Sequence, residues 1–332
     1  MDGAVTATGC VALTARRAMV PHGRPAALGK GFGRPLRATL RRVTARSEAP
    51  ASFRSSSVSP GSLGLIADGI REVLSRRRLI LYMVRADIKK SGADTLLGNV
   101  WWVVDPLIQM LIYSVLVTLI FDRQVDDYGL FVFSAILPWK WFEATVKDGV
   151  TAITAQERLI KQIYFPKLVL PVAAVSAGIV NFAFGLVPLV GLTIVLYSDR
   201  LSWWLLLIPV VAAVQFVFSL SVAIALSAAN VFYRDIGNLS RHLLRFWFYL
   251  SPTLYSPAVI LNSKFMQDNE WAAVLYNLNP WVHLLNSYRS LTYYDQAPDW
   301  LGLGVLLLVS LVLVAGATLL FKRVEPTFAK VL

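Results

Sequence analysis

The chain has 332 residues, of which 56% are hydrophobic and 16% charged, and its mean hydropathy is +0.58. These values exclude an ordinary soluble domain and are typical of a polytopic membrane protein. The formal net charge is +12, but residues 1–67 hold ten Lys/Arg and two Asp/Glu with few aromatics to stack on bases, so the charge does not indicate nucleic acid binding.

Residues 1–67 are predicted to form a disordered basic tail. They are rich in Arg, Ala, Ser, Gly and Pro and lack the continuous apolar core of a secretory signal. A targeting segment for an organellar membrane, a cytosolic extension and an over-long start all have this composition, and the alternatives stay open. Cys10, the only cysteine, lies here, so no intrachain disulfide or cysteine-based metal site is expected.

Residues 68–98 are predicted to form an amphipathic interface helix on the cytosolic membrane surface. Leu81, Val84 and Ile88 mark an apolar stripe, while Arg85 and Lys89 belong to the opposite, basic face. A helix of this kind lies flat among anionic head groups. The pattern fits simple anchoring and partner docking equally well.

Residues 99–332 are predicted to form an all-α domain with six transmembrane helices. The apolar stretches cover about 99–121, 128–147, 168–197, 203–229, 240–260 and 300–321. Lys and Arg gather before the first stretch, between the second and third, between the fourth and fifth, and after the sixth. By the positive-inside rule, both termini are expected in the cytosol.

The segment QERLIKQIYFPK, residues 156–167, is predicted to be a short cytosolic amphipathic helix that ends before Pro166. Leu159 and Ile163 are four residues apart, as are Ile160 and Tyr164, and Glu157 can pair with Lys161. A simple connector needs only polar turn residues. The pattern therefore indicates a surface that a partner grips.

Residues 252–298 on the outer side are predicted to form short re-entrant helices. Pro252 and Pro257 interrupt one apolar run, and Asn279 with Pro280 is a typical helix start. Such helices can shape or close a pore provided that their backbone ends are buried against protein.

No catalytic or metal-binding residue is predicted. The sequence contains no P-loop, nucleophile elbow, zincin helix or cluster of inward carboxylates. Lys140 and Glu143, three residues apart, are expected to form a structural ion pair, and interfacial capping accounts for Asp105. Arg245 fits either a phosphate contact or a side chain that reaches to the membrane surface.

Aromatic residues are abundant, and most of them fit the interfacial belts of a membrane protein. A subset facing a shared cavity would suit sugars, whose C–H faces pack on rings. The candidates for a substrate channel are Trp101, Trp139, Trp141, Phe142, Arg245, Tyr255, Trp281 and Tyr288.

Several collinear segments carry a family resemblance that covers about residues 70–330. In order they are RADIKKSGADTLLGNVWWVVDPLIQMLIYSVLVTLIF, LPWKWFEATV, ERLIKQIYFPKLVLPV, NVFYRDIGNL, YLSPTLYSP and LNPWVHLLNSYRSL. Their order resembles that of the permease subunit of type-2 ABC exporters for polysaccharides and polyol phosphates, the O-antigen, capsule and teichoic-acid exporters. No single motif decides the match.

The resemblance implies that a separate ATPase subunit binds ATP and Mg and drives this chain, which would hold no cofactor and would not itself be an enzyme. The residues assigned to coupling are Gln156, Glu157, Arg158, Leu159, Ile160, Lys161, Ile163, Tyr164 and Phe165, with Arg85 on the interface helix and Tyr233, Arg234 and Asp235 in an inner loop.

The resemblance also implies a homodimer in the cell inner membrane that exports a glycan on a polyprenyl-pyrophosphate lipid, such as the lipopolysaccharide O-antigen. Two alternatives remain: a type-2 exporter of drugs or small lipids, and a polytopic polyprenyl-phosphate transferase. The absent carboxylate cluster disfavours the transferase. The basic tail and Lys140 are departures that the family does not explain.

Overall fold

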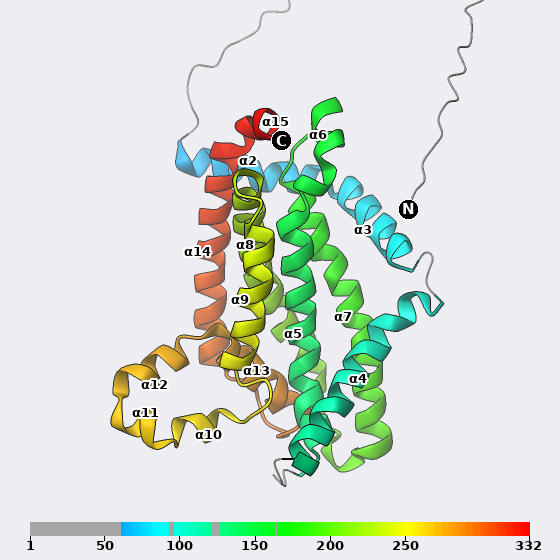
Figure 1. Ribbon diagram of the computed structural model, residues 1–332, viewed down its shortest axis with the longest axis vertical. Coiled ribbons are helices and arrows are strands. Elements are labelled where there is room, and N and C mark those ends of the chain that lie inside the picture. Colours follow the sequence, from blue (N-terminus) through cyan, green and yellow to red (C-terminus); the bar gives the residue numbers. More distant parts are fainter. Residues whose placement is uncertain (1–60, 93–95, 121–125, 164) are drawn as a thin grey trace, which may run out of the picture. The chain divides into compact units, whose positions relative to one another are not determined.

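The computed structural model describes residues 61–92, 96–120, 126–163 and 165–332, and all regular elements within these ranges are helical, as predicted. All but the first of the principal helices of the described part run roughly along the longest axis, and the first runs obliquely (Figure 1). They are α4 (Trp101–Val115), α5 (Tyr128–Thr151), α7 (Val169–Leu196), α8 (Ile208–Phe232), α9 (Ile236–Leu250) and α14 (Trp300–Val324).

Four helical stretches of the described chain are long and apolar enough to cross a membrane: Gly98–Thr118, Val169–Leu196, Trp203–Phe232 and Trp300–Val331. Of the six spans predicted, the other two correspond to α5 and α9. α5 has 24 residues but carries Lys140, Glu143 and Lys147, which lower its hydropathy. The chain is therefore a multi-pass helical membrane protein with four clear candidate spans.

The predicted span over residues 240–260 is wrong at its second half. α9 has 15 residues and ends at Leu250, and Ser251 adopts an extended conformation with φ −91° and ψ 150°. Pro252 is the reason, because a residue that precedes proline is pushed out of the α region. The apolar run continues past this point, but the helix does not.

The N-terminal part of the described chain forms two helices where one was predicted. α2 (Ser62–Ser75) and α3 (Arg77–Ser91) meet at Arg76, whose φ of −99° and ψ of 19° break the helix. α2 begins at Ser62, before the predicted boundary at residue 67. Gly69 on its inner face packs against α14. The predicted boundary of the tail is thus displaced, and residues 1–60, including Cys10, lie outside the described residues.

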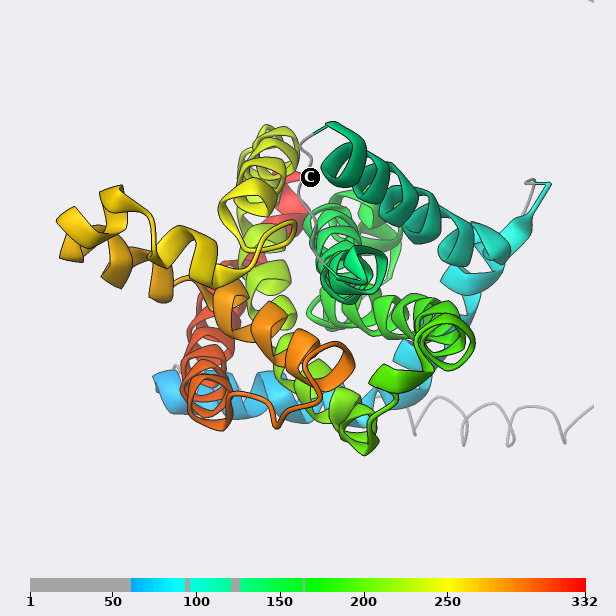
Figure 2. The ribbon, with the colours of Figure 1, turned by 90° about the horizontal axis from the view of Figure 1, so that it is seen from below.

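Short helices α10 (Pro257–Leu261), α11 (Lys264–Asp268) and α12 (Glu270–Asn277) project to one side of the bundle, whereas α13 (Pro280–Thr292) enters it (Figure 2). The predicted start of α13 is confirmed, since the Asn279 side chain accepts a hydrogen bond from the Trp281 backbone N–H at 3.1 Å. Ten residues of α13 are buried.

The two ends of the bundle differ in the elements that they carry (Figure 1). We call one the α6 end, because it holds α2, α6 (Glu157–Gln162) and the C-terminal α15 (Phe328–Val331), and the other the α13 end. Short 3₁₀ or π turns join the helices at Gly98–Val100, Leu116–Ile120, Thr154–Gln156, Ser198–Arg200, Trp203–Leu207 and Glu325–Thr327.

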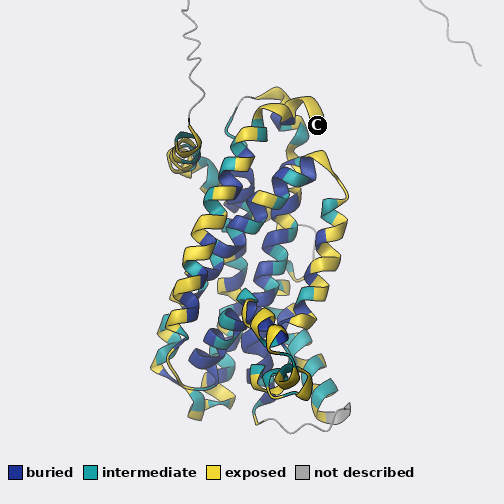
Figure 3. Cartoon of the chain, turned by 90° about the vertical axis from the view of Figure 1, so that its left-hand side faces the viewer, coloured by how far each residue is buried: buried dark blue, intermediate teal, exposed yellow. Residues whose placement is uncertain are grey.

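Buried residues lie along the inside of the bundle (Figure 3), and their apolar side chains form two clusters. The larger cluster surrounds α5, from Tyr128 to Val150, and is rich in aromatic rings. The smaller cluster lies at the α6 end. Its buried members are Ile153, Ile160, Leu168, Leu170, Ile224, Ala228, Val231, Ala317, Phe321 and Phe328, and we call it the α6-end cluster.

Candidate functional site

The predicted coupling helix is present but shorter than expected. α6 spans six residues, Glu157–Gln162, after a 3₁₀ turn over Thr154–Gln156. Ile163 is already extended, with φ −130° and ψ 133°, so the predicted pairing of Leu159 with Ile163 on one helical face is wrong. The chain must be extended ahead of Pro166, which explains the early end. Tyr164 lies outside the described residues.

α6 presents one side to the protein and another to its surroundings. Ile160 is 6% exposed and belongs to the α6-end cluster, against which Phe165 also packs. Ile163 is 56% exposed, and Gln156, Arg158 and Lys161 are exposed as well. Ile160 therefore fixes α6 to the bundle, while the charged residues and Ile163 remain available to a partner.

Glu157 connects α6 to the turn between α8 and α9. Its carboxylate lies 2.7 Å from the Lys161 Nζ and 3.9 Å from an Arg234 guanidinium nitrogen. The hydrogen bond and charge of Lys161, helped by Arg234, lower the pKa of Glu157 below its ordinary value. Both pairs are therefore present at neutral pH and weaken as the pH falls through that lowered pKa.

An ion pair thus joins α6 to one of the other predicted coupling elements, the exposed Tyr233–Asp235 turn. Asn230, which was not predicted, holds this turn in place. It is 4% exposed, donates to the Val150 carbonyl at 3.0 Å and accepts from the Gly237 backbone N–H at 3.1 Å. A lone Asn at the end of an apolar stretch gives little signal in the sequence.

α6 lies between two grooves. One, of about 560 Å³, is polar and includes Lys147, Glu157, Arg234 and Arg241 in its lining. The other, of about 630 Å³, is mainly apolar. Its lining residues are Leu79, Tyr82, Met83, Ala86, Asp87, Lys90, Asp148, Thr151, Ala152, Ala155, Gln156, Leu159, Ile163, Phe165, Leu170, Ala173 and Ala174.

The second groove places α3, the predicted interface helix, beside α6. On α3, Val84 is buried and Ile88 half-buried, as the predicted apolar stripe requires, but Leu81 is 56% exposed and does not belong to the buried face. Arg85 is exposed on the same helix. α3 and α6 therefore present polar and apolar side chains at the same end of the bundle.

The predicted substrate channel needs a correction. Trp139, Trp141, Phe142, Trp281 and Tyr288 are at most 4% exposed and form the packed aromatic core of the described chain. The Trp281 ring centre lies 4.8 Å from those of both Trp139 and Phe142. Rings packed in this way cannot contact a passing substrate. The short distances between these rings reflect packing around α5 rather than the wall of a channel.

Three of the channel candidates remain accessible. Trp101 is 46% exposed at the start of α4, and Arg245 is exposed on α9. Tyr255 is half-buried and donates a hydrogen bond to the Leu250 carbonyl at 3.1 Å.

The charges at mid-bundle pair differently from the prediction. Lys140 forms its ion pair with Asp105 of α4, not with Glu143, which instead lies 2.6 Å from the Lys147 Nζ. The reason is that the Lys140 side chain points across to α4, whereas Glu143 and Lys147 are four residues apart on α5. Lys140 thereby gains a role that the sequence left unassigned: it joins α4 to α5.

Arg289 is a second residue that sequence reasoning missed. It is fully buried on α13 and donates hydrogen bonds to four backbone carbonyls: Pro252 at 2.5 Å, Thr253 at 2.6 Å, Tyr255 at 3.2 Å and Phe131 at 3.3 Å. Its guanidinium carbon lies 3.8 Å from the Phe131 ring centre. Arg289 thus fixes the turn that follows α9 against α5 and α13.

Comparisons with known proteins show the family of the chain. A family model described as ABC-2 type transporter matches residues 78–293. The O-antigen export system permease protein RfbA of Myxococcus xanthus is 32% identical over 261 residues, which cover 79% of this chain and 98% of that protein. Its namesake in Klebsiella pneumoniae is 25% identical, covering 76% of this chain and 95% of its own length.

The match spans α3 from residue 78, α6, the turn between α8 and α9, and α13, whereas α14 and α15, which contribute Ala317, Phe321 and Phe328 to the α6-end cluster, lie beyond it. A family of this kind supplies the membrane subunit of a transporter and implies an ATP-binding partner. The chain belongs to the ABC-2 type transporter family.

Proposed function

We propose that this chain is the membrane-embedded subunit of an ATP-driven exporter that moves lipid-linked polysaccharide from the cytosol to the outer side of the cell inner membrane. The observation that carries the proposal is the two-sided α6, with Ile160 anchored in the bundle and Ile163 exposed. The similarity to two O-antigen export permeases over nearly their whole length supports the cargo class.

In this proposal a separate subunit binds ATP and Mg and pushes on the α6 end. The two grooves beside α6 give such a partner a surface of mixed chemistry, and the Glu157–Arg234 contact would carry the push toward α9. Interfaces commonly combine an apolar centre with a charged rim. The exposed Ile163 and the half-buried Leu159, with Arg158 and Lys161 around them, have that composition.

The proposal includes six spans, with α5 and α9 as the second and fifth. Charges on α5 need not prevent it from crossing, because Lys140 pairs with Asp105 and Glu143 with Lys147. The Lys/Arg distribution supports a cytosolic α6 end. Labelling tests this orientation: in a Cys10→Ala background, Arg158→Cys should resist an impermeant thiol reagent added outside, and Lys264→Cys should react.

The proposal also includes a homodimer with a channel between the two copies. Large apolar side chains remain exposed along α4, among them Ile108, Leu111, Ile112 and Val115, and Asp105 is exposed beside them. A carboxylate is costly to leave against lipid. A second copy and a water-filled path between the two would accommodate this face, along with Trp101 and Arg245.

Export itself can be tested in proteoliposomes that contain the chain, its ATP-binding partner and a polyprenyl-pyrophosphate glycan. We expect ATP-dependent movement of the glycan, which Leu159→Asp combined with Ile163→Asp abolishes. Val274→Asp combined with Leu275→Asp is the matched control, since it places the same two charges on exposed positions of α12 at the opposite end. Undiminished export by the α6 double variant would contradict the proposal, and movement of small lipids alone would favour a different cargo.

A further inference from the structure

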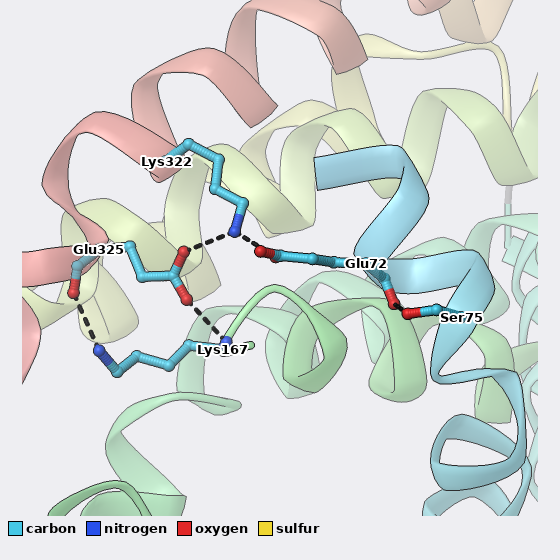
Figure 4. Close-up of polar contacts among 5 residues, drawn as sticks. All are labelled: Glu72, Ser75, Lys167, Lys322 and Glu325. Carbon is cyan, nitrogen blue, oxygen red and sulfur yellow. Dashed lines mark hydrogen bonds and ion pairs between the residues drawn. The ribbon is translucent and has the colours of Figure 1, made fainter. Parts of the chain in front are cut away.

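Four charged residues from distant parts of the chain meet at the α6 end (Figure 4). Lys322, near the end of α14, forms ion pairs with Glu72 of α2 and with Glu325, whose carboxylate oxygen lies 2.9 Å from the Lys322 Nζ. The Lys322 side chain is 9% exposed and that of Glu325 is 14% exposed. We call Glu72, Lys167, Lys322 and Glu325 the Lys322 clasp.

Lys167 brings the α6 segment into this clasp. It directly follows Pro166, and its backbone N–H donates to the second Glu325 carboxylate oxygen at 2.8 Å. Its side-chain Nζ donates to the Glu325 backbone carbonyl at 3.0 Å and lies 5.8 Å from the Phe328 ring centre. Glu325 thus binds Lys167, which follows α6 in the chain, and Lys322 near the end of α14.

Close packing beside the clasp leaves little freedom for α2. Gly69 lies one turn before Glu72, and a Cβ on it would come within 2.8 Å of the Thr318 methyl carbon, which lies one turn before Lys322. α2 and α14 therefore touch at a small residue and are joined by an ion pair one turn further along.

The clasp is electrically balanced, with two lysines and two glutamates. The Lys322 ammonium donates hydrogen bonds to carboxylate oxygens of both Glu72 and Glu325. The Lys322–Glu325 pair has little exposure and is screened weakly by solvent, whereas the Glu72 side chain is 37% exposed. Removal of Lys322 leaves both carboxylates without their counter-charge.

We propose that Lys322 and Glu325 are positioning residues for coupling, which transmit a displacement of the α6 segment to α14 and α2. This inference rests on the proposed function. Without the clasp, the connection between α6 and α7 would be free to bend and would absorb the push. With the clasp, Lys167, the end of α14 and the whole of α2 move as one unit.

Hydrogen exchange of the purified chain tests the clasp without any transport assay. Lys322→Met should increase exchange by about tenfold at residues 165–168 and along α2, while α5 and α8 keep their protection. Lys161→Met is the matched control, because it removes an exposed lysine that pairs only within α6. Unchanged exchange at residues 165–168 and in α2 would overturn the inference.

Two further variants keep the test decisive if Lys322→Met does not fold. Glu72→Gln detaches α2 alone and should raise exchange in α2 but not at residues 165–168, whereas Lys322→Arg keeps both pairs and should restore protection. Protection in α2 that is insensitive to Glu72→Gln would refute its place in the clasp.

The coupling role is then read in proteoliposomes with the ATP-binding partner. Glu325→Gln should lower glycan export per ATP hydrolysed by about tenfold while the hydrolysis rate persists. Equal losses of hydrolysis and export would indicate a structural role only and would overturn the inference. Failure of the unaltered chain to export would instead count against the proposed function, and the exchange results on the clasp would still stand.

Discussion

The two sides of α6 predict opposite behaviour for two isoleucines three residues apart. Ile160→Ala removes three buried carbon atoms at a position 6% exposed, which costs about 2.4 kcal/mol of transfer free energy before any cavity term. Such a loss shifts the equilibrium between docked and undocked α6 about 50-fold toward the undocked state. Ile163→Ala, at a position 56% exposed, should change the docking free energy of α6 in the isolated chain by less than about 0.5 kcal/mol.

The assay is local hydrogen exchange over residues 157–162, measured first on the chain alone and then with the ATP-binding subunit. Ile160→Ala should accelerate exchange about 50-fold in the chain alone. Ile163→Ala should leave the chain alone unchanged and weaken binding of the partner. Equal effects of the two substitutions on the isolated chain would refute the two-sided description of α6.

Three other substitutions test the interior. Arg289→Leu leaves the carbonyls of residues 252, 253 and 255 without their donor and should lower stability by at least about 3 kcal/mol, read as a lower Tm in detergent; an unchanged Tm would contradict the role of Arg289 in fixing the turn. Lys140→Met should lower Tm by leaving Asp105 unpaired, and Asp105→Asn in the same chain should restore most of the loss, since no charge then remains. Gly185→Val should destabilise by about 1–3 kcal/mol, because Leu137 already fills the space a side chain would need; Gly191→Val, where nothing lies near, is its control.

Helix existence could be predicted from the sequence because long apolar runs are bounded by charges and prolines. The run predicted as 168–197 is α7, Val169–Leu196. The predictions that were wrong concerned features that depend on tertiary structure. The rotation of α5 decides that Lys140 meets Asp105 rather than Glu143, and periodicity carries no information about which neighbour a side chain faces.

The candidate site was predictable in its location and not in its detail. The segment around Pro166 was identified by its amphipathic pattern, but the early end of α6 and the inward turn of Ile160 depend on the cluster against which it packs. Arg289 lies in the segment predicted to form re-entrant helices, and the sequence assigned it no role. Only the fold reveals the four carbonyls that it serves.

The Lys140–Asp105 pair also affects how the chain enters the membrane during its synthesis. α4 leaves the ribosome before α5, and alone it would bring an unneutralised carboxylate toward the hydrocarbon phase, a step that costs about 2.5–3.5 kcal/mol. Its counter-charge is synthesised 35 residues later. In the six-span arrangement proposed above, the two helices therefore enter the membrane most favourably together, as a hairpin whose charges are already paired.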